Sequence, residues 1–348
     1  MESKRSVSFV HGKNALITGA TSGIGLQMAI SLAAMGANLI IAARSISKAD
    51  DVVKTIHKSC PMATISVVRL DLNSFSSVRE AARHIKATFS AVHLLVANAG
   101  LMVMGSKPQL TQDKFEMHFQ CNYLSHFLLI RELEGLLIAS APARVVITAS
   151  RIHSSGHIGF EDYNFTKPET KYGMMRAYAH SKFAVVLATY ELNRRLSPHG
   201  VTVNCCHPGI IRSNIFTEFV PAWVACWLWP MAYPFMAPWM KTTKRGAKAS
   251  LRLATSPEFE GRGGIYTDSS GDPVASSAPS REVKRQQDFY ALSCLLTGTP
   301  EATQLPPSAA ATAAADPAPG TAPLPPSAPV PEAPVPATDA APLLVAPL

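Results

Sequence analysis

Short apolar runs rich in β-branched residues alternate with amphipathic stretches through most of this 348-residue chain, and this alternation limits the folds open to it. The stretches between the runs, such as 24–35 and 78–88, have helical spacing. Strands that alternate with helices in this way predict one doubly wound parallel α/β sheet, whose ligands bind beyond the carboxyl ends of the strands. The expected strands are Ala15–Thr18, Asn38–Ala43, Ile65–Leu70, Leu94–Asn98, Val145–Ser150 and Val201–His207.

The C-terminal residues 300–348 have a different composition. They hold 14 of the 27 prolines and 15 alanines, but no lysine, arginine or aromatic residue. Such a segment cannot build a hydrophobic core. We therefore expect one folded domain over residues 1–298 and a disordered Pro/Ala-rich tail over 299–348, which is either inert or a ligand for a proline-reading domain.

The charge of the chain is uneven. The net charge is +8, yet the tail holds four acidic residues and no basic one, which leaves +12 on the rest. A basic domain favours phosphorylated cofactors and anionic membrane surfaces. Basic and aromatic residues do not interleave as they do in a nucleic-acid groove, so we expect no nucleic-acid partner.

The cysteines and histidines form no recognisable metal or disulfide pattern. The six cysteines lack C-x-x-C spacing, as expected for reduced thiols in a protein that faces the cytosol: Cys60, Cys121, Cys205, Cys206, Cys226 and Cys294. We also expect no metal at the four histidines near the predicted site, which are His153, His157, His180 and His207. Residues 1–10 lack the apolar segment of a cleaved secretory signal.

A glycine-rich turn joins the first expected strand to the first helix. Glycines at this position let the backbone approach a pyrophosphate, which then binds to the free N–H groups of the helix. The spacing G-x-x-x-G-x-G differs from the G-x-G-x-x-G dinucleotide fingerprint. The expected phosphate-binding residues are Gly19, Thr21, Ser22, Gly23, Ile24 and Gly25.

The second and third strands end in residues that bear on the choice of cofactor. Arg44 follows the second strand, where enzymes for the unphosphorylated dinucleotide usually place an acid. A guanidinium there favours a 2′-phosphate, so we expect NADP(H). Asp71 and Leu72 follow the third strand and contact the adenine, or else Asp71 caps the helix that begins near Ser74.

Small polar residues follow the fourth and fifth strands, and a Tyr/Lys pair follows later. The fourth strand runs into Asn98, Ala99 and Gly100, and the fifth runs into Ser150. Tyr178 and Lys182 are four residues apart in an apolar helical stretch, so they share one helix face. An adjacent ammonium stabilises a phenolate and lowers the tyrosine pKa toward neutrality, which suits acid/base chemistry.

These motifs resemble the short-chain dehydrogenase/reductase family, which has a Rossmann fold, over about residues 12–297. The resemblance implies that Tyr178 transfers the proton, Lys182 binds the nicotinamide ribose and Ser150 orients the substrate oxygen. It also implies that Asn122 holds a water for proton relay. Cofactor binding is then completed by Pro208, Gly209 and Ile211.

A second Y-x-x-x-K motif, Tyr163 with Lys167, lies closer to Ser150 in the sequence. Lys167 precedes Pro168, which disfavours helical geometry there, so that this pair would not share a face. We therefore expect Tyr178 and Lys182 to be the functional pair and residues 151–176 to be an insertion near the site.

The insertion and the sequences around 122–129 and 256–264 are similar to the retinol dehydrogenase-like branch of the family, which includes the WW-domain oxidoreductase and an X-linked dehydrogenase/reductase of polyprenoids. Ala97 departs from the second Asn that many members have. The resemblance implies a homodimer through helices around 113–137 and 177–196.

Residues 219–240 contain four tryptophans and no charged side chain, and Lys241, Lys244, Arg245 and Lys248 follow. Four prolines interrupt this segment, and a spanning helix would split the fold. We expect an apolar substrate lid that also touches a membrane surface through 219–248. A membrane span and an ordinary buried lid or dimer contact remain the alternatives.

Together these features predict an NADP(H)-dependent oxidoreductase that interconverts alcohol and carbonyl groups on a lipophilic substrate of the retinoid, polyprenoid or steroid type. We expect it on the cytoplasmic side, associated peripherally with the endoplasmic reticulum or lipid droplets. The alternative is a catalytically quiet NADP-binding scaffold whose tail recruits partners.

Overall fold

The computed structural model of the chain describes residues 8–156, 162–167, 170–209, 211 and 242–303. The predictions for the apolar segment 219–240, for Cys226 and His157, and for the tail beyond residue 303 lie outside these ranges.

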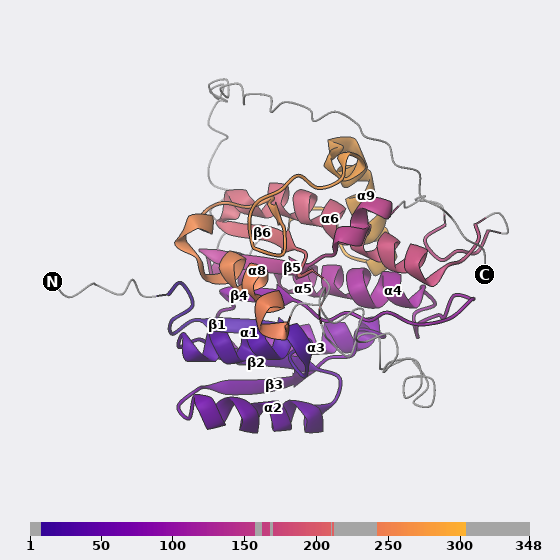
Figure 1. Ribbon diagram of the computed structural model, residues 1–348. Coiled ribbons are helices and arrows are strands. Elements are labelled where there is room, and N and C mark those ends of the chain that lie inside the picture. Colours follow the sequence, from indigo (N-terminus) through magenta and orange to yellow (C-terminus); the bar gives the residue numbers. More distant parts are fainter. Residues whose placement is uncertain (1–7, 157–161, 168–169, 210, 212–241, 304–348) are drawn as a thin grey trace, which may run out of the picture. The chain divides into compact units, whose positions relative to one another are not determined.

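Seven parallel strands form one sheet in the order β3-β2-β1-β4-β5-β6-β7. Figure 1 shows them stacked from β3 at the bottom to β6 near the top. The chain leaves the β1–β2–β3 side and returns at β4 beside β1, which places the topological switch point between β1 and β4. The predicted doubly wound α/β fold is confirmed. The strands are β1 (Asn14–Thr18), β2 (Asn38–Ala43), β3 (Ile65–Arg69), β4 (Leu94–Ala97), β5 (Ala143–Thr148), β6 (Val201–Cys206) and β7 (Tyr266–Thr267).

The helices cover both faces of this sheet. Buried side chains of α1 (Gly23–Ala34), α2 (Ile46–Ser59) and α8 (Thr243–Thr255) form one core cluster. Those of α3 (Phe75–Thr88), α5 (Ser125–Ala139), α6 (Met174–Leu196) and α9 (Val283–Thr297) form the other. The shorter elements are α4 (Met117–Phe119), the π-helix η1 (Gln120–Leu124) and the 3₁₀ helices η2 (Arg151–Ser155), η3 (Ser197–His199), η5 (Pro257–Phe259) and η6 (Ala278–Arg281).

Three of the long helices begin at a hydroxyl side chain. Ser45, Ser74 and Thr242 each accept a hydrogen bond from the backbone N–H three residues later, at the starts of α2, α3 and α8. Ser74 therefore caps α3, and the alternative role of Asp71 as that cap is wrong. The Asp71 side chain instead accepts a hydrogen bond from the Asn73 N–H at 3.0 Å.

The central helix α6 is enclosed within the chain, and it has no exposed side chain between Ala177 and Leu192. Part of its cover is α9, whose Phe289 and Tyr290 are fully buried in the same core cluster. The dimer contact expected through α6 therefore has no open surface in this stretch of the described chain.

The residues directly after α9 bind to the folded domain. The buried Arg131 donates from Nη2 to the carbonyl oxygens of Pro300 and Ala302, both at 2.7 Å. Arg195 donates from Nη1 to the Glu301 carbonyl oxygen at 2.9 Å. The folded domain thus extends beyond the boundary that we placed at residue 298. Within the described ranges, no helix combines the length and apolarity needed to cross a bilayer.

Candidate active site

The carboxyl ends of β1, β4 and β5 face a cleft of about 1090 Å³. Of the predicted site residues, only Gly25 and Asn122 are not in its lining. The predicted residues that line it are Gly19, Thr21, Ser22, Gly23, Ile24, Arg44, Asp71, Leu72, Asn98, Ala99, Gly100, Ser150, Tyr178, Lys182, Pro208, Gly209 and Ile211.

The glycine turn after β1 leaves no room for a side chain at Gly19 or Gly25. A Cβ on Gly25 would lie 2.1 Å from the Gly19 carbonyl oxygen, and a Cβ on Gly19 would lie 2.7 Å from the Ala99 Cα. Gly19 also has a φ of +69°, which favours glycine. Ser22 precedes α1 without a side-chain cap, so the first N–H groups of the helix lack a side-chain acceptor. This geometry fits a dinucleotide pyrophosphate.

Two cations lie at the cleft end of β2. Arg44 follows the strand, and Lys48 lies in the first turn of α2, the helix that Ser45 caps. Both side chains are exposed, and neither forms an ion pair with another residue in the described part of the chain. They are available for a phosphate group.

A hydrogen-bond network joins the ends of β1, β4 and β5 at the cleft. The Thr18 hydroxyl accepts from the N–H groups of Asn98 and Ala99, both at 3.0 Å, and contacts His126 Nε2 at 2.9 Å. The Thr148 hydroxyl donates to Asn98 Oδ1 at 3.3 Å. Burial, with a smaller contribution from the Lys182 charge, lowers the pKa of His126 to about 4, so this imidazole is neutral. The network fixes the position of Asn98 although residue 97 is an alanine and supplies no side-chain amide of its own.

Tyr178, Ser150 and Lys182 converge from α6 and the end of β5. The Ser150 hydroxyl acts on the Tyr178 hydroxyl and lowers its pKa. The Lys182 Nζ lies 5.8 Å from the centre of the Tyr178 ring and donates to the Thr148 carbonyl oxygen at 2.8 Å. One helix turn separates the Tyr and Lys positions, as the Y-x-x-x-K spacing predicts.

The protonation of this pair differs from the sequence-based expectation. Loss of hydration raises the pKa of Tyr178 to about 12, and the Ser150 hydroxyl offsets only part of this. Burial also lowers the pKa of Lys182 to about 8. In the chain alone, desolvation therefore outweighs the ammonium, because Lys182 is directed toward the Thr148 carbonyl.

Asn122 lies in the π-helix η1, a geometry that is frequent at functional sites. Its side chain pairs with the backbone of Leu101: Oδ1 accepts from the Leu101 N–H at 2.7 Å, and Nδ2 donates to the Leu101 carbonyl at 3.0 Å. Nδ2 also donates to Ser181 at 3.1 Å. Asn122 thus fixes a segment of the cleft wall.

The alternative pair Tyr163 and Lys167 is not on a helix. The Tyr163 ring stacks on Phe119 at 5.4 Å and packs against Phe115 at 5.8 Å, and neither Tyr163 nor Lys167 lines the cleft. The geometry therefore favours Tyr178 and Lys182.

Sequence reasoning missed the apolar side of the cleft and a buried pair beside it. The lining includes five apolar residues from four separate segments, and no motif marks them: Met102, Val103, Met117, Ile152 and Met175. Glu116 and His118 are fully buried and in contact at 2.6 Å, close to Tyr178. A buried acid two residues from a histidine gives no sequence signal.

A model of the short chain dehydrogenase family matches residues 13–222. The chain belongs to this family. The match includes the glycine turn, Ser150 and the Tyr178/Lys182 pair. Short-chain dehydrogenases are NAD(P)-using oxidoreductases that interconvert alcohol and carbonyl groups, and this chain is such an enzyme, from the retinol dehydrogenase-like branch.

The relatives place it within that branch. The WW domain-containing oxidoreductase of Gallus gallus is 38% identical over 286 residues, which cover 81% of this chain and 66% of that protein. Retinol dehydrogenase 13 of Mus musculus is 38% identical over 292 residues, covering 81% of this chain and 82% of that protein. The chain therefore spans slightly less than two thirds of the first relative and most of the second.

Among solved structures, an uncharacterized protein from Mycobacterium paratuberculosis is similar with a TM-score of 0.67 at 29% sequence identity. The similarity covers 86% of this chain and 98% of that protein.

Proposed function

We propose that the chain is an NADP(H)-dependent oxidoreductase that interconverts alcohol and carbonyl groups on a lipophilic substrate, with Tyr178 as the acid/base. The observation that carries the proposal is the convergence of Tyr178, Ser150 and Lys182 in a cleft that also contains the glycine turn.

The preference for the phosphorylated cofactor rests on Arg44 and Lys48. Two cations at the end of β2, which form no ion pair with the described residues, complement a 2′-phosphate and would have no such partner on the unphosphorylated dinucleotide. The nicotinamide cofactor, when bound, supplies or accepts the hydride.

The proton is handled by residues of the chain. With a pKa of about 12, Tyr178 is protonated at neutral pH and can donate its proton to a developing alkoxide. Ser150, which lines the cleft with Tyr178, can donate to the same oxygen and so orient the carbonyl. Lys182 lies on the same helix face, where its ammonium stabilises the phenolate that remains after proton transfer.

A lipophilic substrate is supported by apolar side chains in the lining of the cleft. Three of them are methionines, Met102, Met117 and Met175, whose flexible thioethers adapt to apolar ligands. One of the relatives is named a retinol dehydrogenase, which agrees with this class.

Peripheral contact with the cytoplasmic face of a membrane belongs to the same proposal. Lys244, Arg245 and Lys248 are exposed in the first turns of α8, and these turns contain no acidic residue. Cations at the start of a helix are unfavourable by themselves and suit an anionic surface. Flotation with phosphatidylserine vesicles, but not with phosphatidylcholine vesicles, is the expected result, and equal recovery with both would contradict it.

The function is tested by following NADPH oxidation with retinal, a polyprenal, a steroid ketone and a short aldehyde. Turnover should favour NADPH and fall by at least about 100-fold in Tyr178→Phe. Tyr163→Phe, which changes the alternative tyrosine, should keep full turnover.

The cofactor preference is tested at Arg44. Arg44→Ala should raise the KM for NADPH about tenfold and leave the KM for NADH unchanged. The control is Arg69→Ala, because Arg69 is exposed at the end of β3, and it should change neither KM. Tight NADPH binding without turnover of any substrate would instead support the scaffold.

A further inference from the structure

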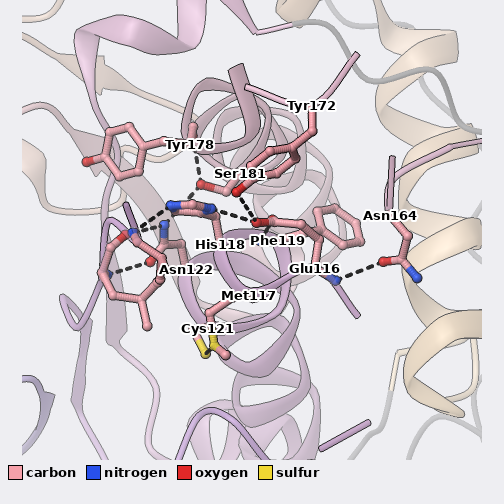
Figure 2. Close-up of polar contacts among 12 residues, drawn as sticks. Glu116, Met117, His118, Phe119, Cys121, Asn122, Asn164, Tyr172, Tyr178 and Ser181 are labelled. Atoms are coloured by element: carbon pink, nitrogen blue, oxygen red, sulfur yellow. Dashed lines mark hydrogen bonds and ion pairs between the residues drawn. The ribbon is translucent and has the colours of Figure 1, made fainter. Parts of the chain in front are cut away.

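A buried acid and imidazole lie next to the proposed acid/base. Glu116 and His118 each have 0% exposed surface, and Glu116 Oε1 contacts His118 Nδ1 at 2.6 Å. Figure 2 shows the pair between the Tyr178 side of the site and the insertion. The His118 and Tyr178 rings meet edge to face, with centres 6.1 Å apart and planes at 74°.

The contacts define which nitrogen of His118 carries the proton. The Val103 N–H donates to Nε2 at 2.9 Å, so Nε2 must present its lone pair. The proton is then on Nδ1 and is donated to Glu116. The other carboxylate oxygen of Glu116 accepts from the Phe119 N–H at 2.9 Å. The acid therefore sets both the tautomer and the orientation of the imidazole.

Through this imidazole the pair holds one wall of the cleft. His118 fixes Val103, and Asn122 fixes Leu101 with two hydrogen bonds, so both ends of the lining segment 101–103 are attached to the α4–η1 helix. This segment and Tyr178 border the same cleft.

The insertion attaches to the same acid from the other side. The Tyr172 hydroxyl donates to Glu116 Oε1 at 3.4 Å. Asn164 Oδ1 accepts from the Glu116 N–H at 2.8 Å, and its Nδ2 donates to the Lys114 carbonyl at 3.0 Å. Burial, reinforced by the Glu116 charge, raises the pKa of Tyr172, so this hydroxyl remains a donor. Glu116 thus contacts both the described part of the insertion and, through His118, the wall.

We propose that Glu116 and His118 are positioning residues that couple Asn164 and Tyr172 of the insertion to the wall 101–103 and thereby set the fit for long apolar substrates. The substrate part of this proposal rests on the proposed function. The coupling itself does not, because it concerns contacts within the chain.

Three variants separate the coupling from general stability. Glu116→Gln keeps the shape but replaces one acceptor oxygen by a donor NH₂ group. Tyr172→Phe removes only the hydroxyl that links the insertion to Glu116. Tyr163→Phe is the matched control, because it removes a hydroxyl from the same insertion, beside Phe115 and Phe119, without a contact to Glu116.

The first readout is amide hydrogen exchange in the peptide that contains residues 101–103, measured without substrate. We expect exchange to be at least about fivefold faster in Tyr172→Phe and Glu116→Gln, and unchanged in Tyr163→Phe. Unchanged exchange in Tyr172→Phe, or equal acceleration in Tyr163→Phe, overturns the coupling. Tyr172→Phe decides the question if Glu116→Gln does not fold.

The second readout is the ratio of kcat/KM for retinal to kcat/KM for a short aldehyde, together with the Kd for NADPH. The ratio should fall about fivefold in the two linked variants, through KM for retinal, with NADPH affinity retained. An equal loss for both aldehydes would show a general structural role and refute the specificity claim. If the unmodified enzyme reduces neither aldehyde, the proposed function fails, and hydrogen exchange still decides the coupling.

Discussion

Replacing Lys182 by methionine should stabilise the cofactor-free protein at neutral pH while it abolishes turnover. Lys182 is 3% exposed, and burial lowers its pKa from the ordinary 10.5 to about 8. At about 1.36 kcal/mol for each pKa unit, holding this ammonium inside the native state costs about 3 kcal/mol below pH 8. Methionine removes that cost but also removes the hydrogen bond to the Thr148 carbonyl, worth about 1 kcal/mol. The expected net gain at pH 7 is about 2 kcal/mol.

The pH dependence follows from the sign of the shift. Below pH 8 the amine is protonated in both the native and the unfolded states, and the native state bears the full cost. Between about pH 8 and 10.5 the unfolded chain keeps its proton while the native state releases it, so the stability of the unmodified protein rises relative to Lys182→Met. The advantage of the variant should therefore shrink by about 2 kcal/mol between pH 7 and 9.5.

Urea unfolding of both proteins at pH 7 and 9.5 measures this difference, with Lys58→Met as a control because that lysine is exposed on α2. A Lys182→Met variant that is less stable at pH 7, or whose stability difference does not change with pH, would refute the reasoning.

Three further predictions concern other parts of the molecule. Gly25→Ala should abolish NADPH binding, measured by fluorescence titration, because its Cβ would lie 2.1 Å from the Gly19 oxygen; unaltered affinity would show that the turn can shift. Arg131→Met should destabilise the protein by about 3 kcal/mol in urea unfolding, since it breaks the buried ion pair between Arg131 and Glu134, and an unchanged midpoint would contradict this. Light scattering after size exclusion should show a monomer, because α6 is covered within the chain; a dimer that cross-links through α6 would be the opposite result.

The parts of the molecule that the sequence predicted well depend on short-range chemistry. The strand–glycine turn–helix unit and the Tyr178/Lys182 spacing are each determined within a few residues, so their motifs specify their geometry. The apolar strands were located to within about two residues of their ends. The short β7 strand escaped detection because two residues carry no periodicity.

The parts that escaped prediction depend on contacts between distant segments. Glu116 receives its partners from His118, Tyr172 and Asn164, and nothing in the local sequence announces that these meet. The Tyr178 pKa was misjudged for a similar reason: four-residue spacing shows that a lysine is near, but not that burial dominates or that the ammonium is directed toward a backbone carbonyl.

The cover that α9 provides for the centre of the fold also sets an order of events during synthesis. The ribosome makes α5 and α6 well before residues 283–302, whose Phe289 and Tyr290 complete the core beside them. Until then, apolar side chains of α5 and α6 are open to water and to other nascent chains. A chain interrupted between His199 and Val283 should therefore require a chaperone to remain in solution, although it already contains the glycine turn and the Tyr178/Lys182 pair.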